Sequence, residues 1–97
     1  MSGDIDVSHL PKLSSVQLYA LALIARSDRT DPPNLTRLQK QLGVPFATVT
    51  KAADRLAADG YVHQIRHGSS VCLRLASKGA NALALLHEMF QREESVQ

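Results

Sequence analysis

Three polar or cationic side chains recur at helical spacing in the middle of the chain. Thr48, Lys51 and Arg55 are three and four residues apart, so a helix would present them as one outward stripe. The cationic groups suit phosphates, and the threonine hydroxyl suits a phosphate or the edge of a base. Ala47 and Thr50 flank the stripe and permit close backbone approach at a helix N-terminus, which favours phosphate. The alternative interpretation is an ordinary solvated helix face.

Other residues that often carry chemistry lack partners at a useful spacing. His87 opens a pattern like the helical zinc-protease motif, but Gln91, four residues later, has no imidazole. Cys72 is the only cysteine, which excludes an intramolecular disulfide, and we interpret it as structural rather than as a redox switch. The histidines are scattered without metal-ligand spacing, at His9, His63, His67 and His87. We expect no enzymatic activity, no metal and no cofactor.

Composition and charge describe one small domain with a basic centre. The chain has 97 residues, of which 44% are hydrophobic and 21% charged, and its net charge is +2. Between Pro33 and Gly79, seven basic side chains oppose only Asp54 and Asp59, whereas both ends are acidic. That distribution suits a polyanionic partner, and it is also compatible with a solvated face. The acidic N-terminus, the single cysteine and the lack of a long apolar run favour a cytoplasmic protein without a signal peptide or membrane span.

The first predicted helix spans Leu13 to Arg26. Ser14 and Gln17 have the spacing of a capping box at its beginning. The helix is apolar almost all round, and a domain of this size covers little surface by itself, so we expect one side to meet another subunit. Residues 1–12 are expected to form a flexible arm or a short helix.

Two further helices separated by a tight turn are predicted next. Asn34 is placed to cap the first of them, and Gly43 is placed to end it. The second, at about residues 46–58, follows Pro45 and ends at Gly60. Apolar residues at helical spacing form its inward face: Val49, Ala52, Ala53 and Leu56.

A β-hairpin follows the third helix. Strands are predicted at residues 61–66 and 71–75, with the turn centred on either His67-Gly68 or Gly68-Ser69. Both registers place the same residues on one face, Val62, Val71, Leu73 and Leu75. They place on the other face Ile65, Cys72 and Arg74.

The last predicted helix runs from Lys78 to about Arg92 and is capped by Ser77. Its apolar stripe is too wide for one neighbour in a small domain. We therefore expect an arm at 1–12, one domain at 13–92 that includes a C-terminal dimerisation helix, and a tail at 93–97.

The order of these elements predicts a winged helix-turn-helix, a mainly α fold with a small β-hairpin. An α-helix fits the major groove of duplex DNA, where base edges are distinguishable, and a hairpin beside it reaches phosphates or the minor groove. Residues 46–58 are thus the predicted recognition helix, and residues 66–70 are the predicted wing.

The same segments resemble the MarR family of bacterial transcription regulators. The resemblance covers about Leu13 to Phe90 and is carried by Leu13–Leu21, Leu38–Val44, Thr48–Lys51, Asp54–Val62 and Leu75–Gly79. It implies a homodimer on a pseudo-palindromic operator and repression, which small phenolic or redox signals sometimes relieve. It also implies recognition-helix contacts by Thr48, Thr50 and Lys51.

Two departures from the family pattern change these expectations. The wing is shorter and lacks the acidic-arginine pair, so Arg66 or His67 would have to replace the family's minor-groove arginine. The terminal helices, which form the family's dimer interface, are trimmed, so the dimer geometry and the ligand cleft are expected to differ.

We accordingly predict a DNA-binding regulator, most simply a repressor, whose partners are double-stranded DNA and a second copy of the chain. The predicted DNA contacts are Arg37, Pro45, Phe46, Ala47, Thr48, Thr50, Lys51, Arg55, Arg66, His67, Ser69 and Ser70. Phe46 suits a thymine methyl or packing against the preceding helix. The predicted dimer contacts are Leu18, Tyr19, Leu23, Leu83, Leu86, Met89 and Phe90. The alternative is a winged-helix protein-interaction module that acts on another regulator.

Overall fold

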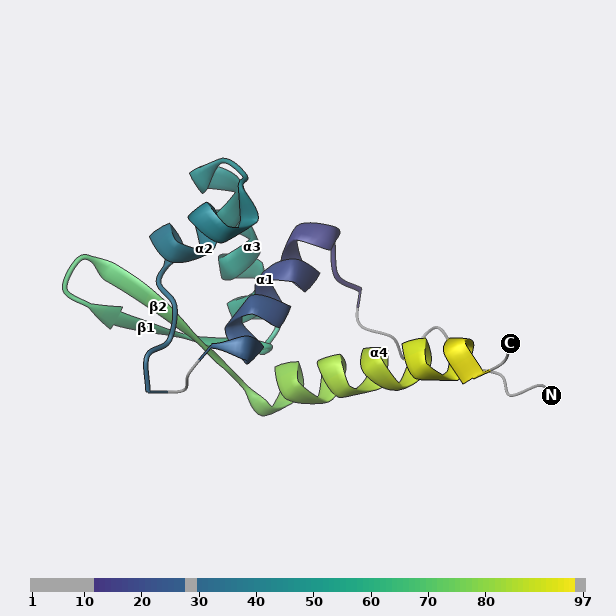
Figure 1. Cartoon of the computed structure of the whole chain (residues 1–97). Coiled ribbons are helices and arrows are strands. Elements are labelled where there is room, and N and C mark those ends of the chain that lie inside the picture. Colours follow the sequence, from purple (N-terminus) through teal and green to yellow (C-terminus); the bar gives the residue numbers. More distant parts are fainter. Residues whose placement is uncertain (1–11, 28–29, 96–97) are drawn as a thin grey trace.

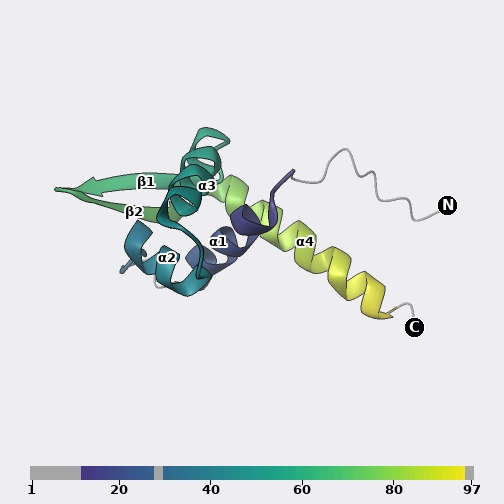
Figure 2. The same ribbon diagram turned by 90° about the horizontal axis from the view of Figure 1, so that it is seen from above.

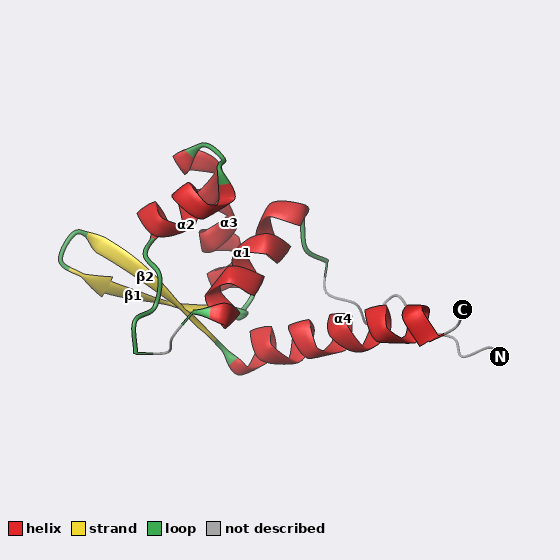
Figure 3. Ribbon diagram, in the orientation of Figure 1, coloured by secondary structure: helices red, strands yellow, loops and turns green. Residues whose placement is uncertain are grey.

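The computed structural model describes residues 12–27 and 30–95, and it contains four helices and one hairpin in those residues. The elements are α1 (Ser15–Arg26), α2 (Leu35–Leu42), α3 (Phe46–Ala58), β1 (Val62–His67), β2 (Ser70–Leu75) and α4 (Ser77–Ser95), as Figures 1 and 3 show. The predicted mainly α fold with a small hairpin is confirmed. Of the predicted arm, residues 1–11 lie outside the described residues, as do residues 96–97 of the predicted tail.

Side-chain caps fix the beginnings of the first two helices. The Ser14 hydroxyl accepts from the Gln17 N–H at 3.2 Å, and the Gln17 side chain accepts from the Ser14 N–H at 3.0 Å, which completes the predicted capping box. The Asn34 side chain accepts from the Arg37 N–H at 2.8 Å at the beginning of α2. Gly43 ends α2 with φ of 68°, a left-handed conformation that favours glycine.

The hairpin register centres the turn on Gly68-Ser69, which decides between the two predicted turns. His67 pairs with Ser70, Ile65 with Cys72 and Val62 with Leu75. The predicted division of residues between the two faces is therefore confirmed. β2 also bonds outside the hairpin, because the Leu73 N–H donates to the Pro33 carbonyl at 2.9 Å. This contact ties the segment before α2 to the middle of β2.

The core lies where α1, α2, α3 and the hairpin meet. Its largest members are completely buried: Leu21, Leu38, Leu56 and Leu73. All four residues predicted to face inward from α3 are buried, at Val49, Ala52, Ala53 and Leu56. Burial of this apolar surface is the main force that holds α3 against α1 and α2.

The last helix differs at both ends from its prediction. α4 includes Ser77 as its first residue, because the Ala76 carbonyl accepts from the Ala80 N–H at 3.0 Å and so begins the helix one residue earlier. The helix also continues to Ser95, three residues past the expected end. From the base of the hairpin, α4 extends away from the other helices, as Figures 1 and 2 show. No helix within the described residues is long and apolar enough to cross a membrane.

Candidate nucleic-acid interface

The exposed face of α3 lies opposite its four buried residues. With about 3.6 residues per turn, the side chains that point most directly into solvent are those of Ala47, Lys51, Asp54 and Ala58. Thr50 lies on one flank of this face, and Thr48 and Arg55 lie on the other. The predicted stripe of Thr48, Lys51 and Arg55 therefore runs along one edge of the exposed face rather than along its centre.

That stripe lines a shallow hollow between α3 and the beginning of α1. The hollow has a volume of about 390 Å³, and its walls are Ser14, Val16, Gln17, Thr48, Lys51, Ala52 and Arg55. The structure thus brings the three predicted α3 side chains together and adds the capped beginning of α1 beside them. The helix was predicted from Leu13 with a capping box of Ser14 and Gln17, and it begins at Ser15 with Ser14 as its N-cap. No local signal predicted that this end lies against α3, because that depends on tertiary packing.

The basic side chains on this side of the molecule differ in their partners. The Arg55 Nε atom lies 3.0 Å from Asp59 Oδ2, and the Arg37 guanidinium lies 3.5 Å from an Asp31 carboxylate oxygen. Both pairs are exposed, so each contributes at most about 1 kcal/mol and can exchange for a phosphate. Lys51 is exposed and forms no ion pair with any described residue. It is therefore the least committed of these cations.

The beginning of α3 presents backbone donors and small or apolar side chains to solvent. The α3 N-cap residue, Pro45, makes no side-chain cap, in contrast to Ser14 and Asn34 in the two preceding helices. Phe46 is 51% exposed, so packing against α2 does not cover it. The Thr50 hydroxyl donates to the Phe46 carbonyl at 3.0 Å. Uncapped N–H groups at a helix N-terminus suit an anion such as a phosphate.

A contact absent from the sequence-based prediction joins α3 to the hairpin. The Gln64 side-chain amide of β1 donates to Asp54 Oδ1 at 3.0 Å. Both residues are exposed and lie ten positions apart. Neither the helical period of α3 nor the strand period of β1 identifies such a pair, because it depends on how the hairpin packs on the helix.

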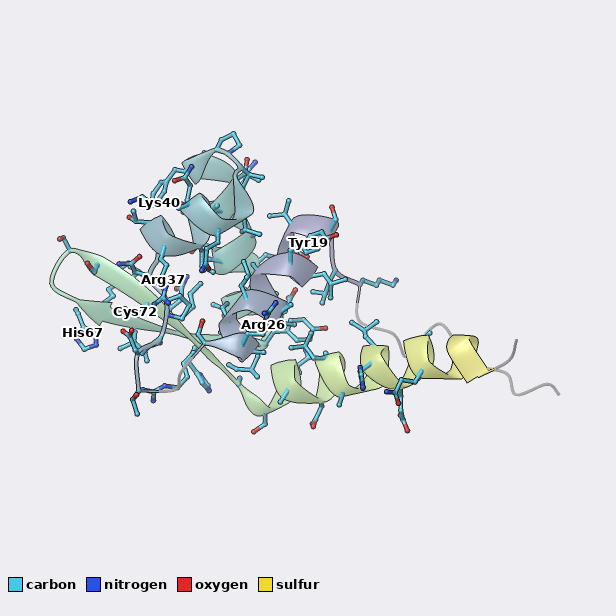
Figure 4. The ribbon with its side chains drawn as sticks, viewed as in Figure 1. Tyr19, Arg26, Arg37, Lys40, His67 and Cys72 are labelled. Carbon is cyan, nitrogen blue, oxygen red and sulfur yellow. The ribbon has the colours of Figure 1, made fainter. Side chains whose placement is uncertain are left out.

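All the predicted wing residues are exposed: Arg66, His67, Ser69 and Ser70. Figure 4 shows His67 at the outer end of the hairpin, far from α4. Successive strand residues alternate between faces, so Arg66 shares the face of Gln64, which contacts α3, whereas His67 points to the other face. Of the two candidates to replace the family's wing arginine, Arg66 is therefore the one on the α3 side.

The predicted dimer contacts fall into two groups. Leu23 and Leu83 are partly buried against the core of the same chain, which leaves less of each for another subunit. Tyr19 is 66% exposed, and Leu18, Leu86 and Met89 are half-buried. The side chain of Phe90 lies outside the described residues. Tyr19 and the later part of α4 thus offer the freest apolar surface of the predicted set.

Cys72 lies within the hairpin. Cys72 is half-buried in β2, paired with Ile65 and bridged to Asn34. Among residues 12–27 and 30–95, no group of three His, Cys, Asp or Glu side chains could hold a metal ion.

Comparison with known proteins identifies the fold. No protein-family model and no curated protein sequence matches the chain. A MarR family protein from Bacillus stearothermophilus is similar in structure, with a TM-score of 0.77 and 22% identity over 92% of this chain and 61% of that one. RV1404 from Mycobacterium tuberculosis gives a TM-score of 0.76 and 21% identity over 87% of this chain and 57% of that one.

Wild-type MarR from E. coli, in its apo form, gives a TM-score of 0.69 and 22% identity over 79% of this chain and 57% of that one. The chain therefore spans about three fifths of the length of these proteins. The element order, the hairpin and these superpositions agree with the predicted resemblance: the chain has the winged-helix fold of the MarR-family transcriptional regulators.

Proposed function

We propose that the chain binds double-stranded DNA as a transcriptional regulator, with α3 in the major groove and the hairpin beside it. The observation that carries this proposal is the exposed face of α3, where Lys51 has no ion-pair partner among the described residues, next to an uncapped helix beginning. The structural similarity to MarR-family regulators supports it. We propose that it acts as a regulator rather than as an enzyme, because proteins of similar structure include transcriptional regulators from Sulfolobus solfataricus and Methanosarcina mazei.

The contacts would divide by chemistry. Lys51, Arg55 and Arg37 would neutralise phosphates, and the last two would exchange their carboxylate partners for the DNA backbone. Ala47 and Thr50 leave room for close approach to base edges, and Phe46 offers an apolar surface to a thymine methyl. In the wing, Arg66, His67, Ser69 and Ser70 would contact the backbone or the minor groove. At the recognition helix, Pro45 and Thr48 would contact the backbone or base edges that border the major groove.

Regulation would require two copies of the chain. A pair would present two recognition helices roughly 34 Å apart, one turn of DNA, and so would select a two-fold related site. We propose that the copies pair through Tyr19 of α1 and the apolar stripe of α4, which the chain itself leaves partly exposed. Repression is the simplest outcome of such a pair occupying a promoter.

Fluorescence anisotropy with labelled duplexes tests this proposal. One duplex carries the region upstream of the protein's own gene, the other has an unrelated sequence, and both are titrated at two salt concentrations. Each phosphate neutralised contributes about 0.9 to the negative slope of log affinity on log salt, so Lys51→Ala should reduce that slope by about 0.9.

Arg26→Ala is the matched control, because Arg26 is an exposed cation at the far end of α1, as Figure 4 shows. It should leave affinity and slope almost unchanged. Binding that is insensitive to salt would contradict the proposal. Absence of binding to both duplexes at low salt would favour the protein-interaction module instead.

A further inference from the structure

The exposed face of α3 contains one acidic side chain among groups suited to DNA. Asp54 is the only acidic residue of the helix, and it lies close to the centre of the exposed face. A carboxylate there repels phosphates, so it weakens binding to DNA of any sequence. A carboxylate on the face of α3 that would contact DNA can still contribute to specificity, if it weakens binding to the wrong sequences more than to the right one.

The hydrogen bond from β1 holds this carboxylate in one orientation. Gln64 Nε2 donates to Asp54 Oδ1 at 3.0 Å, and the same hairpin face is anchored in the core by Val62, which is 2% exposed. An ionised carboxylate is an acceptor only, with room for further donors at its second oxygen. Asp54 makes no ion pair with a described residue, so Oδ2 is not committed to a cation.

The edges of the four bases in the major groove meet such an acceptor differently. Cytosine presents the N4 amino group, which is a donor, whereas guanine presents two acceptors and thymine presents the O4 acceptor. Adenine places the N7 acceptor beside its N6 donor, which would repel the carboxylate. A fixed, doubly accepting side chain therefore favours cytosine and disfavours the other three bases.

Asp54 is also within reach of a base pair if α3 enters the groove. It is seven residues after Ala47 on the same exposed face, about 10 Å further along the helix axis. Lys51 lies between Ala47 and Asp54 along the helix. Lys51 could therefore contact a phosphate while Asp54 contacts a base.

We propose that Asp54 is a specificity-determining residue, which accepts a hydrogen bond from the cytosine N4 amino group, and that Gln64 is its positioning residue. This inference rests on the proposed DNA-binding function and deepens it. It assigns the contact between α3 and the hairpin a role in the choice of sequence in addition to its role in the fold.

Selection from a library of duplexes with a randomised centre, followed by sequencing of the bound fraction, tests this assignment. The wild-type chain should select cytosine at one position of each half-site. Asp54→Ala should lose that preference by about tenfold, keep the preferences at other positions, and bind the unselected library more tightly. Asp54→Asn should shift the same position toward adenine, because an amide pairs with adenine N6 and N7.

Two further variants serve as comparisons for Asp54→Ala: one removes the residue that positions Asp54, and the other removes a negative charge elsewhere. Gln64→Ala should weaken the preference at that one position without changing the helix content measured by circular dichroism. Glu88→Gln removes one negative charge from the exposed side of α4 and should leave every preference unchanged.

Several outcomes would overturn the assignment. Unchanged preferences in Asp54→Ala would exclude a role in readout, and an equal loss of preference at every position would make the role of Asp54 purely structural. If the wild-type chain binds no duplex at low salt, the proposed function fails and this assignment fails with it.

Discussion

The part of the chain up to Leu83 and the later part of α4 differ in how well the chain covers its own apolar surface. In the first part, Leu21, Leu38, Leu56 and Leu73 are completely buried. Beyond Leu83, the apolar residues Leu85, Leu86 and Met89 remain partly exposed, and none belongs to the core cluster. The first part therefore has a core of its own, and none of the later α4 side chains that the structure describes, at residues 84–89 and 91, belongs to it.

The contacts that attach α4 to the preceding elements lie at the beginning of this helix. Lys78 Nζ lies 4.6 Å from the centre of the Tyr61 ring and donates to the Asp59 carbonyl at 2.6 Å. Gly79 lies directly against the Tyr61 carbonyl, and Ala82 is buried. One turn and a half of α4 thus fixes its direction, and the remaining length projects its apolar stripe toward whatever covers it.

The largest expected effect is the loss of a core side chain. Leu56→Ala should lower the free energy of unfolding by about 2–5 kcal/mol, because it opens a cavity among completely buried neighbours. Leu85→Ala, the same substitution in the later part of α4, should lower it by less in the monomer, because Leu85 is partly exposed and lies outside the core cluster. Urea unfolding at low protein concentration measures both, and equal losses would show that α4 belongs to the same core.

A smaller effect is expected at the attachment of α4. Gly79→Ala would place a Cβ atom against the Tyr61 carbonyl and the Leu75 side chain, and such overpacking costs about 1–3 kcal/mol. The better helix propensity of alanine offsets up to about 1 kcal/mol of that cost. Asn81→Ala, at an exposed position nearby in the same helix, is the control and should not destabilise the chain. Thermal unfolding compares the two variants, and a stabilising Gly79→Ala would contradict the close contact.

The beginnings of α1 and α4 offer a matched pair of still smaller changes. Ser14→Ala removes the side-chain acceptor of a capping box and should cost about 1 kcal/mol. Ser77→Ala should cost less, because Ser77 is the first residue of α4 and its side chain makes no described cap. Chemical unfolding of the two variants ranks the caps. A larger loss of unfolding free energy for Ser77→Ala than for Ser14→Ala would indicate that Ser77 caps α4, as the sequence predicted.

Local chemistry made much of the fold predictable. Ser14, Asn34 and Gly43 mark helix ends because their effects act within one turn of the backbone. The inward face of α3 followed from the period of Val49 and Leu56, since burial of one helix face imposes that period. The hairpin turn stayed open between two registers until the pairing of His67 with Ser70 placed it.

The candidate site was only partly predictable, because it depends on contacts between elements. The spacing of Thr48 and Arg55 placed them on one stripe, but only packing shows that this stripe faces the beginning of α1. The hydrogen bond between Gln64 and Asp54 could not be predicted from the sequence pattern of α3 or of β1 alone. Helix and strand periods report which side is buried, and they do not report which neighbour lies beside each exposed side chain.

Leu86 in the later part of α4 is the residue whose substitution best tests pairing between two copies of the chain. Leu86→Glu places a charge in the apolar stripe of α4, outside the core cluster, so it should lower the free energy of unfolding of a monomer by less than Leu56→Ala does. If that stripe is the surface that joins two copies, a buried, unpaired carboxylate would dissociate them. Sedimentation velocity should then show a dimer for the wild-type chain and a monomer for Leu86→Glu.

His87→Glu adds a negative charge at the neighbouring, more exposed position and should leave the wild-type dimer intact. A wild-type chain that sediments as a monomer, or a Leu86→Glu variant that remains dimeric, would contradict pairing through α4. If Leu86→Glu dissociates the dimer and the chain stays folded, the fold does not depend on the contact between copies. The elements before α4 would then fold on their own core, and the apolar side chains of Leu85, Leu86 and Met89 would be covered by a second copy.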